Sequence, residues 1–395
     1  MPPPIRGSAR LTRLSAYAFA AIQEKVAELT ARGLAPVDFG VGDPTLPTPE
    51  IVRRACAEGV ERHASAGYPP YRGTAEFRRA VAAWTQRRFG VKLDPEKEIC
   101  SSIGSKEAIF HFPEAIIDPG DIVLVPDPGY PPYARGTLFA EGKSHLMPIT
   151  AANDFLPDLD AVPDAVARKA RICWLTHPNS PTGKVAPPEF IERWIGWCRE
   201  RGIIAASDEA YSELYFGDEA PRTALEYGRE GVVVFQSLSK RSAMTGYRIG
   251  WVAGDPAIVK LFEKVKTNVD SGTPWFIQDA AIAALSDEKH VEGFRKHYRK
   301  LRDRLVTAFE KAGCPRSEPE ATIYIWQKTP RGVGSIEFAE RLLDPKIAAV
   351  TIPSAALRSS EEPERPEDAY VRLSLVPSEA DCERVARAIE KHLKV

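Results

Sequence analysis

Short apolar runs alternate with amphipathic segments along most of the chain. The runs are four to six residues long and rich in β-branched side chains, which is typical of buried strands. The clearest of them are residues 121–126, 171–176, 203–207, 232–235 and 249–253. Other segments carry apolar residues at helical spacing, and this spacing predicts helices over residues 14–29, 49–57, 74–89 and 188–199.

The order of these elements indicates the fold class. Between about residues 95 and 250 strands and helices alternate, which predicts an α/β protein with a mostly parallel, doubly wound sheet. After a largely helical stretch, strands at 322–326 and 370–375 and a helix over 378–393 are typical of a smaller α+β unit. We therefore predict a large domain of residues 45–280 and a small domain built from both chain ends, residues 1–44 and 281–395.

Composition excludes several classes of function. A formal net charge of −1 over 395 residues gives no electrostatic case for nucleic acid or an anionic membrane as a partner. No apolar run reaches transmembrane length, and we expect neither a membrane span nor a signal peptide. The six cysteines are scattered without paired spacing, which favours reduced thiols in a cytoplasmic protein and argues against disulfides or a metal site.

The stretch around Lys240 carries the clearest candidate chemistry. Lys240 lies between two predicted strands, with Ser237 and Ser239 before it, Arg248 after it and Gly246 as the expected turn residue. An amine must be neutral to attack a carbonyl, and burial and a nearby cation both favour the neutral form. The arrangement therefore fits an enzyme with a Schiff-base lysine, whereas an isolated lysine is more often a solvated loop residue.

Further polar residues follow the predicted strands, at the edge where an open α/β sheet binds its ligands. Gly104, Ser105 and Lys106 end one strand and begin a helix, whose free N–H groups can bind a phosphate. Tyr130 follows the next strand and could stack on a flat ligand, although a tyrosine in such a turn is equally often structural.

Asp208 and Tyr211 follow the strand at 203–207. A carboxylate at the end of a buried strand is costly unless it is paired, and either a pyridinium nitrogen or an arginine could be its partner. Taken alone, the two residues are more often a helix cap and a core residue. Together with the lysine, the stacking aromatic ring and the phosphate-binding turn, they form the set expected for pyridoxal 5′-phosphate (PLP).

Seven motifs extend this interpretation over essentially the whole chain, which resembles the class I and II aminotransferases of fold type I. The motifs occur in the family's order: YPPYRG from Tyr68, GSKEAI from Gly104, DPGYPPY from Asp127, PNSPTG from Pro178, SDEAY from Ser207, SLSK with GYRIG from Ser237, and VRLSL from Val371. The resemblance implies an aspartate aminotransferase-like fold, PLP as the cofactor, and amino acids and 2-oxo acids as substrates.

The resemblance also implies roles for individual residues. Lys240 would bind the cofactor covalently and move the proton during the reaction. Asp208 would pair with the pyridinium nitrogen, Tyr211 would donate to the phenolic oxygen, and Tyr130 would stack on the ring. The cofactor's phosphate would be bound by six residues: Gly104, Ser105, Lys106, Ser237, Ser239 and Arg248.

Other positions match the family's contacts to the partner subunit and the substrate. Tyr68 would reach the phosphate of the neighbouring subunit, which implies a homodimer with shared active sites. Arg372 would bind the substrate α-carboxylate through its planar guanidinium group, and Gly42 would lie in the segment that closes over the substrate. Lys106 and Tyr17 match positions that contact the distal part of the substrate; by their residue types alone, a solvent-facing lysine and a packed tyrosine are equally frequent.

One motif departs from the family's pattern. The family usually has Asn directly before Pro-Thr-Gly, where it donates to the cofactor's phenolic oxygen, but this chain has Ser180 there, preceded by Asn179. Either Ser180 makes this contact, directly or through water, or a shifted loop brings Asn179 into place. The pattern slightly favours Ser180.

The motifs define the identity of the substrate less closely than they define the type of reaction. Residues 68–81, 89–99, 104–110 and 125–133 resemble LL-diaminopimelate aminotransferases, and 237–255 also resembles the enzymes that act on the N-succinyl form. We expect amino transfer between glutamate or 2-oxoglutarate and one of these two compounds, in lysine biosynthesis. The alternatives are a broader aspartate, alanine or aromatic aminotransferase, a PLP-dependent C–S lyase, and a non-enzymatic PLP-binding regulator, which the lack of a recognisable DNA-binding module counts against.

Overall fold

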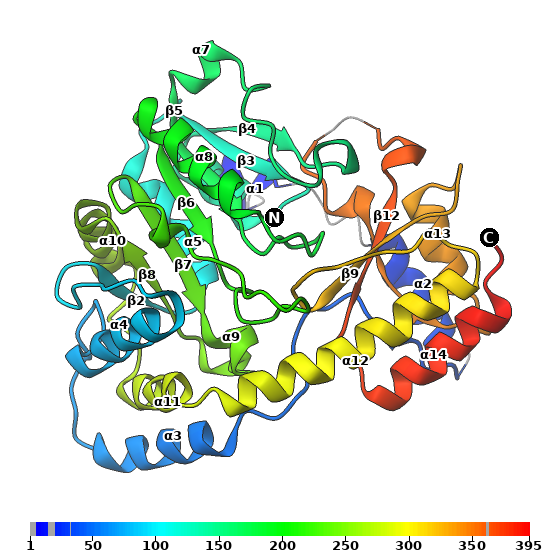
Figure 1. The fold of residues 1–395 in the computed structure, drawn as a ribbon, viewed down its shortest axis with the longest axis horizontal. Coiled ribbons are helices and arrows are strands. Elements are labelled where there is room, and N and C mark those ends of the chain that lie inside the picture. Colours follow the sequence, from blue (N-terminus) through cyan, green and yellow to red (C-terminus); the bar gives the residue numbers. More distant parts are fainter. Residues whose placement is uncertain (1–4, 15–19, 32, 361–362) are drawn as a thin grey trace.

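The computed structural model describes residues 5–14, 20–31, 33–360 and 363–395. A seven-stranded sheet with helices on both faces forms the larger part of the molecule, and a smaller group of strands and helices lies beside it (Figure 1). The predicted α/β class with a mostly parallel sheet is confirmed.

The large sheet has the strand order β2-β8-β7-β6-β5-β3-β4, and β8 runs antiparallel to the other six strands. Its strands are β2 (Ile99–Ser102), β3 (Ile122–Asp127), β4 (Lys143–Pro148), β5 (Ala170–Thr176), β6 (Ile204–Asp208), β7 (Val232–Ser237) and β8 (Gly250–Gly254). The apolar runs did not predict β4. It lies at the sheet edge, where its first residues are exposed, so it needs few apolar side chains.

Helices cover both faces of this sheet, each over its own apolar cluster. One face is covered by α4 (Ala75–Phe89), α8 (Pro188–Glu200) and α11 (Trp275–Ser286), with α3 (Glu50–Arg62) packed on α11. The other face is covered by α5 (Ser105–Ile116), α6 (Pro132–Phe139) and α10 (Pro256–Val269). Since both faces are buried, the inner strands read as continuous apolar runs, and this is why their pattern was easy to recognise.

The smaller group combines residues from both chain ends around a third apolar cluster. Its strands are β1 (Val37–Asp38), paired with β10 (Ala349–Val350), and an antiparallel sheet of β11 (Ile352–Pro353), β12 (Tyr370–Ser374) and β9 (Tyr324–Lys328). Its helices are α2 (Ala20–Ala31), α12 (Lys289–Lys311), α13 (Ser335–Leu342) and α14 (Glu379–His392). In Figure 1 the long helix α12 runs from beside α11 to α14. The predicted domain limits stay a prediction.

Some predicted elements change at their ends. The predicted helix over 14–29 corresponds to α2, which begins at Ala20, and residues 15–19 lie outside the described residues. Helix α4 begins after Thr74, whose hydroxyl accepts a hydrogen bond from the Phe77 N–H at 3.1 Å, and ends at Gly90 in a left-handed conformation. In the part of the chain that the structure describes, no helix is both long and apolar enough to cross a membrane.

Candidate active site

The candidate residues gather where the strands of the large sheet end. Strand β7 ends at Ser237, and a single helical turn, α9 (Leu238–Arg241), carries Lys240. Lys240 therefore lies on a short helical turn, and the chain does not run directly from β7 to the next strand. The Ser237 hydroxyl accepts a hydrogen bond from the Ser239 N–H at 3.2 Å and donates to the Ser239 hydroxyl at 2.9 Å, which fixes this turn.

The Lys240 amine is set for nucleophilic chemistry. Its Nζ donates to the carbonyl oxygen of Gly42, in the N-terminal segment. Burial lowers the pKa of Lys240, and the nearby Arg248 and Arg372 cations lower it further, against the opposing effect of Asp43 and Tyr324. The shift is toward the neutral form that a nucleophilic amine needs.

Asp208 lies at the end of β6 with both carboxylate oxygens held. The Tyr133 hydroxyl donates to Oδ2 at 2.7 Å, and the Ala210 N–H donates to Oδ1 at 3.2 Å. Tyr133 is fully buried, lies 2.8 Å from the Thr176 hydroxyl and stacks on Trp174. Burial raises the pKa of Asp208 to about 6, although the Tyr133 hydrogen bond opposes this rise. A cation against this carboxylate would restore its ionised form, as a pyridinium nitrogen would.

Tyr133, which holds the Asp208 carboxylate, was not among the residues predicted from the sequence. It is the last residue of the DPGYPPY motif, in which only Tyr130 was singled out. Tyr130 is half-buried and packs edge-on against Tyr133, with ring centroids 5.8 Å apart. The repeated tyrosine in one motif was the available signal.

The phosphate-type residues form a cradle between β2 and β8. Gly104 has a φ of 74°, and a Cβ there would lie 2.6 Å from Nη2 of Arg248, so the guanidinium group packs directly against this glycine. Ser105 and Lys106 begin α5, where the first N–H groups of the helix have no intrahelical acceptor. The Lys106 side chain is exposed.

Gly246 lies in a turn, as predicted, because it is the central residue of the 3-10 turn Thr245–Tyr247. The left-handed conformations after Lys240 fall on Ala243 and on Arg248, whose φ is 54°, and Gly246 has no positive φ. Arg248 is held in this conformation by its own side chain, because its Nη1 donates to the Thr245 carbonyl at 2.8 Å.

Arg372 approaches the site from β12. Its Nη2 donates to the Gly40 carbonyl at 3.0 Å, its guanidinium carbon lies 4.4 Å from the centre of the Tyr324 ring, and its Nε is buried without a hydrogen-bond partner among the described residues. The Tyr211 hydroxyl donates to that of Tyr324 at 3.4 Å. Gly42 lies so close that a Cβ there would be 1.8 Å from the Tyr324 hydroxyl. Tyr324 is a second residue that sequence reasoning missed.

Asn179 and Ser180 lie in one turn, in which Asn179 makes several hydrogen bonds. The Asn179 Oδ1 accepts from the Thr182 N–H at 3.2 Å and from its hydroxyl at 2.9 Å, while its backbone N–H donates to the Lys184 carbonyl at 2.8 Å. These bonds use the Asn179 side-chain oxygen and backbone N–H within its own turn, and Ser180 is half-buried beside it. They do not use the Asn179 side-chain amino group, which is the donor that the contact needs, so both residues stay candidates.

Two further residues were predicted from the motifs. Tyr68 is 86% exposed, on the loop between α3 and α4. Tyr17 lies outside the described residues.

The side chains fit PLP, the cofactor that the resemblance implies. An amine of lowered pKa, an acid for a ring nitrogen and a cradle of N–H, hydroxyl and guanidinium donors converge from neighbouring strand ends, and the orphaned Nε of Arg372 suits a substrate carboxylate. In the described ranges no group of three or more His, Cys, Asp or Glu side chains is placed to hold a metal.

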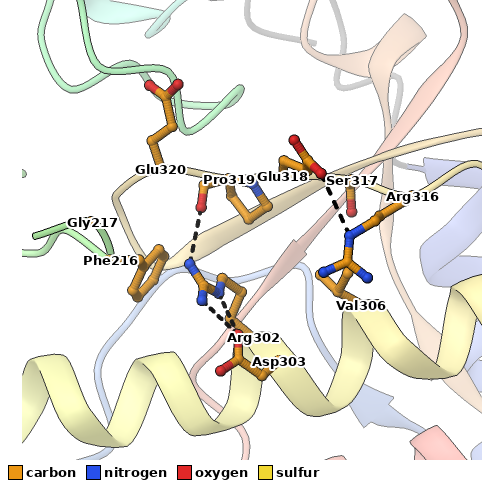
Figure 2. Close-up of a pocket in the computed structure, with 10 residues that line it drawn as sticks. All are labelled: Phe216, Gly217, Arg302, Asp303, Val306, Arg316, Ser317, Glu318, Pro319 and Glu320. Atoms are coloured by element: carbon orange, nitrogen blue, oxygen red, sulfur yellow. Dashed lines mark hydrogen bonds and ion pairs between the residues drawn. The ribbon is translucent and has the colours of Figure 1, made fainter.

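A separate pocket of about 360 Å³ lies between α12 and residues 316–320 (Figure 2). Its two arginines already have partners. Arg302 pairs with Asp303 at 2.5 Å and packs over Phe216, and Arg316 pairs with Glu310 at 2.6 Å. None of the candidate residues lines this pocket, so we assign it no part in the chemistry.

Comparison with known proteins gives a family match over most of the chain. Residues 35–389 match the family described as aminotransferase class I and II. The chain is 43% identical over 394 residues to the LL-diaminopimelate aminotransferase of Aquifex aeolicus, which covers 98% of this chain and 99% of the relative. It is 42% identical to the enzyme of the same name from Desulforudis audaxviator, over 93% of this chain and 92% of the relative.

Solved structures agree with this match. A probable N-succinyldiaminopimelate aminotransferase from Thermus thermophilus superposes with a TM-score of 0.86 at 30% identity, over 95% of this chain and all of the other. A mutant aspartate aminotransferase from Thermus thermophilus superposes with a TM-score of 0.88 at 26% identity, over 98% of this chain and all of the other.

Proposed function

We propose the substrate and assembly of this protein from the premise that its chain belongs to the aminotransferase class I and II family. The family uses PLP to exchange amino groups between amino acids and 2-oxo acids, and this chain is a PLP-dependent aminotransferase. When bound, PLP supplies an electron sink for the charge that develops when the substrate Cα loses its proton.

We propose that the protein transfers an amino group between LL-diaminopimelate and 2-oxoglutarate, in the diaminopimelate branch of lysine biosynthesis. One observation carries this proposal: relatives at 42–43% identity over nearly the whole chain bear the name LL-diaminopimelate aminotransferase. The N-succinyl form is the second candidate, favoured by the structural likeness to the Thermus protein.

Residues of the sheet edge would perform the proton transfer. Lys240 would bind the cofactor and then, as a free amine, take the proton from the substrate Cα, which its lowered pKa supports. Asp208, oriented by Tyr133, would keep the ring nitrogen protonated. Tyr211 and either Ser180 or Asn179 would donate to the phenolic oxygen, with Tyr130 against the ring.

Residues of the smaller group would orient the substrate. Arg372 would bind the α-carboxylate. Its Nε without a hydrogen-bond partner and its stacking on Tyr324 support this role. Gly42 would leave room for the substrate beneath the N-terminal segment. We assign the distal carboxylate and amine to Lys106 and Tyr17, and this assignment rests on the motif resemblance.

We further propose a cytoplasmic homodimer. The exposed Tyr68 supports shared active sites, because a tyrosine on a tightly held loop has no other evident use. The absence of disulfides among the six cysteines supports a reducing compartment.

A half-reaction screen tests the proposed substrate. The purified protein, loaded with PLP, is mixed in turn with LL-diaminopimelate, N-succinyl-LL-diaminopimelate, glutamate, aspartate and alanine, and the loss of the cofactor's visible absorbance is followed. We expect LL-diaminopimelate and glutamate to react fastest, and 2-oxoglutarate to restore the absorbance. A faster reaction with the N-succinyl form would favour the second candidate, and aspartate or alanine alone reacting would contradict both.

A further inference from the structure

Lys266 is the most deeply buried cation among the described residues. It lies on α10, its side chain is 0% exposed, and its Nζ lies 2.5 Å from Asp270 and 3.9 Å from Glu107. Burial of an ammonium group costs free energy unless the group is paired and hydrogen-bonded, and here two carboxylates from different segments provide the pairing.

Glu107 connects Lys266 to the phosphate cradle. Its Oε2 accepts a hydrogen bond from the Ile103 N–H at 3.0 Å, and Ile103 directly precedes Gly104. Its Oε1 is buried without a hydrogen-bond partner among the described residues. Burial raises the pKa of Glu107 and Lys266 opposes this rise, so the ammonium group favours the charged form that holds the Ile103 N–H.

Asp270 connects Lys266 to the loop that carries Tyr68. Its Oδ1 accepts from the Gly272 N–H at 2.7 Å. Gly272 has a φ of 90°, and a Cβ there would lie 2.9 Å from the Pro70 carbonyl oxygen and 3.1 Å from that of Pro69, so the loop rests directly on this turn. The carbonyl of Arg72 accepts from the Ser101 N–H at 3.0 Å, which ties the same loop to β2.

We propose that Lys266 is a positioning residue that aligns two parts of the phosphate site: the turn at Gly104 in its own subunit and the loop whose Tyr68 serves the partner subunit. The inference rests on the proposed roles of Gly104, Ser105 and Tyr68. The buried cation lets two carboxylates approach from different segments, and each carboxylate fixes one turn through a backbone N–H. A displacement of the turn at Gly104 would thus also displace the loop that carries Tyr68, and the reverse.

A comparison of PLP with pyridoxal, which lacks the phosphate, tests this role. The full-length protein is stripped of cofactor and titrated with each compound, followed by absorbance. In the Lys266→Met protein we expect the Kd for PLP to rise about tenfold, which corresponds to about 1.4 kcal/mol. The Kd for pyridoxal should stay within about twofold of wild type, because the lysine-binding chemistry is untouched.

Arg304→Met is the matched control. Arg304 bridges α12 and α14 through Glu383 at 2.5 Å and Glu390 at 2.9 Å, away from the phosphate cradle. Its loss should change stability without changing the ratio of the two Kd values. Should Lys266→Met fail to fold, Glu107→Gln keeps the shape and an acceptor for Ile103, and we expect it to lower the preference for PLP about threefold.

Three outcomes would overturn the inference. A folded Lys266→Met or Glu107→Gln protein with the wild-type ratio of Kd values would leave Lys266 a purely structural residue. An equal loss of PLP and pyridoxal affinity would indicate general damage to the site. A wild-type protein that binds both compounds equally well would remove the assigned phosphate site itself, and with it that part of the proposed function.

Discussion

The two ends of the candidate site are built differently. The cofactor end, around Lys240 and Asp208, follows adjacent strands of one sheet. Hydrogen bonds at that edge hold Asp208 and Ser237, and one bond, from Lys240 Nζ to the Gly42 carbonyl, reaches the N-terminal segment. The substrate end, around Gly42 and Arg372, joins the N-terminal segment to a strand more than 300 residues away through hydrogen bonds to backbone carbonyls.

This difference indicates that the cofactor end carries out the reaction and the substrate end selects the substrate. A rigid, buried sheet edge can hold a neutral amine and a costly carboxylate, because the sheet determines where they lie. A boundary between two groups of elements can open and close around a substrate and can change its specificity without disturbing the sheet. Mutations at the cofactor end should therefore affect kcat and cofactor binding, and those at the substrate end should affect KM.

Lys240→Ala should have the largest effect. Because both the covalent attachment and the proton transfer are assigned to this amine, we expect kcat to fall by about four orders of magnitude. After borohydride treatment, the peptide containing residue 240 should lack the mass of the reduced cofactor. The exposed Lys260 provides the control, and Lys260→Ala should keep both activity and the mass increase. A labelled peptide in the Lys240→Ala protein from any other lysine would contradict the assignment.

Asp208→Asn should stabilise the cofactor-free protein at neutral pH. The pKa of Asp208 is raised to about 6 from 3.8, so the folded state holds its proton more tightly than the unfolded state does. Stability from this group is fully present below about pH 4 and is lost as the pH rises through about 6, a loss of about 3 kcal/mol.

Denaturant unfolding at pH 4 and pH 8 measures this difference. Asp208→Asn should be more stable than wild type at pH 8 and equal to it near pH 4, whereas Asp218→Asn, at an exposed position, should match wild type at both. Equal stabilities of Asp208→Asn and wild type at pH 8 would show that the ionised carboxylate does not lower the free energy of unfolding.

Arg372→Lys should act on the substrate end alone. A lysine keeps the charge but loses the planar pair of donors, so we expect kcat/KM for the amino donor to fall about 50-fold, mostly through KM. The Kd for PLP should not change. Arg331→Lys, at an exposed position, is the matched control. A fall in kcat with an unchanged KM would break the proposed division between the two ends.

The sequence predicted the cofactor end better than the substrate end, for a physical reason. Buried strands are recognisable as apolar runs, and their ends place Asp208 and Ser237 without knowledge of distant contacts. Strand β4 was not predicted, because an edge strand needs few apolar residues. Tyr324 was not predicted as a site residue, because its approach to Gly42 depends on how the smaller group packs. The turn at Arg248 escaped because a side-chain hydrogen bond there offsets the strain that a glycine would avoid.

Tyr133→Phe should have the smallest effect and sharpens the comparison most. The mutation removes the donor to Asp208 Oδ2, whose hydrogen bond lowers the pKa of that carboxyl, so the acid should ionise less readily and kcat should fall about tenfold with little change in KM. Tyr298→Phe is the control, because the Tyr298 hydroxyl is buried without a hydrogen-bond partner among the described residues and its loss should leave kcat unchanged. If Tyr133→Phe raised KM and kept kcat, Tyr133 would support the substrate end, and the proposed division of roles between the two ends would not hold.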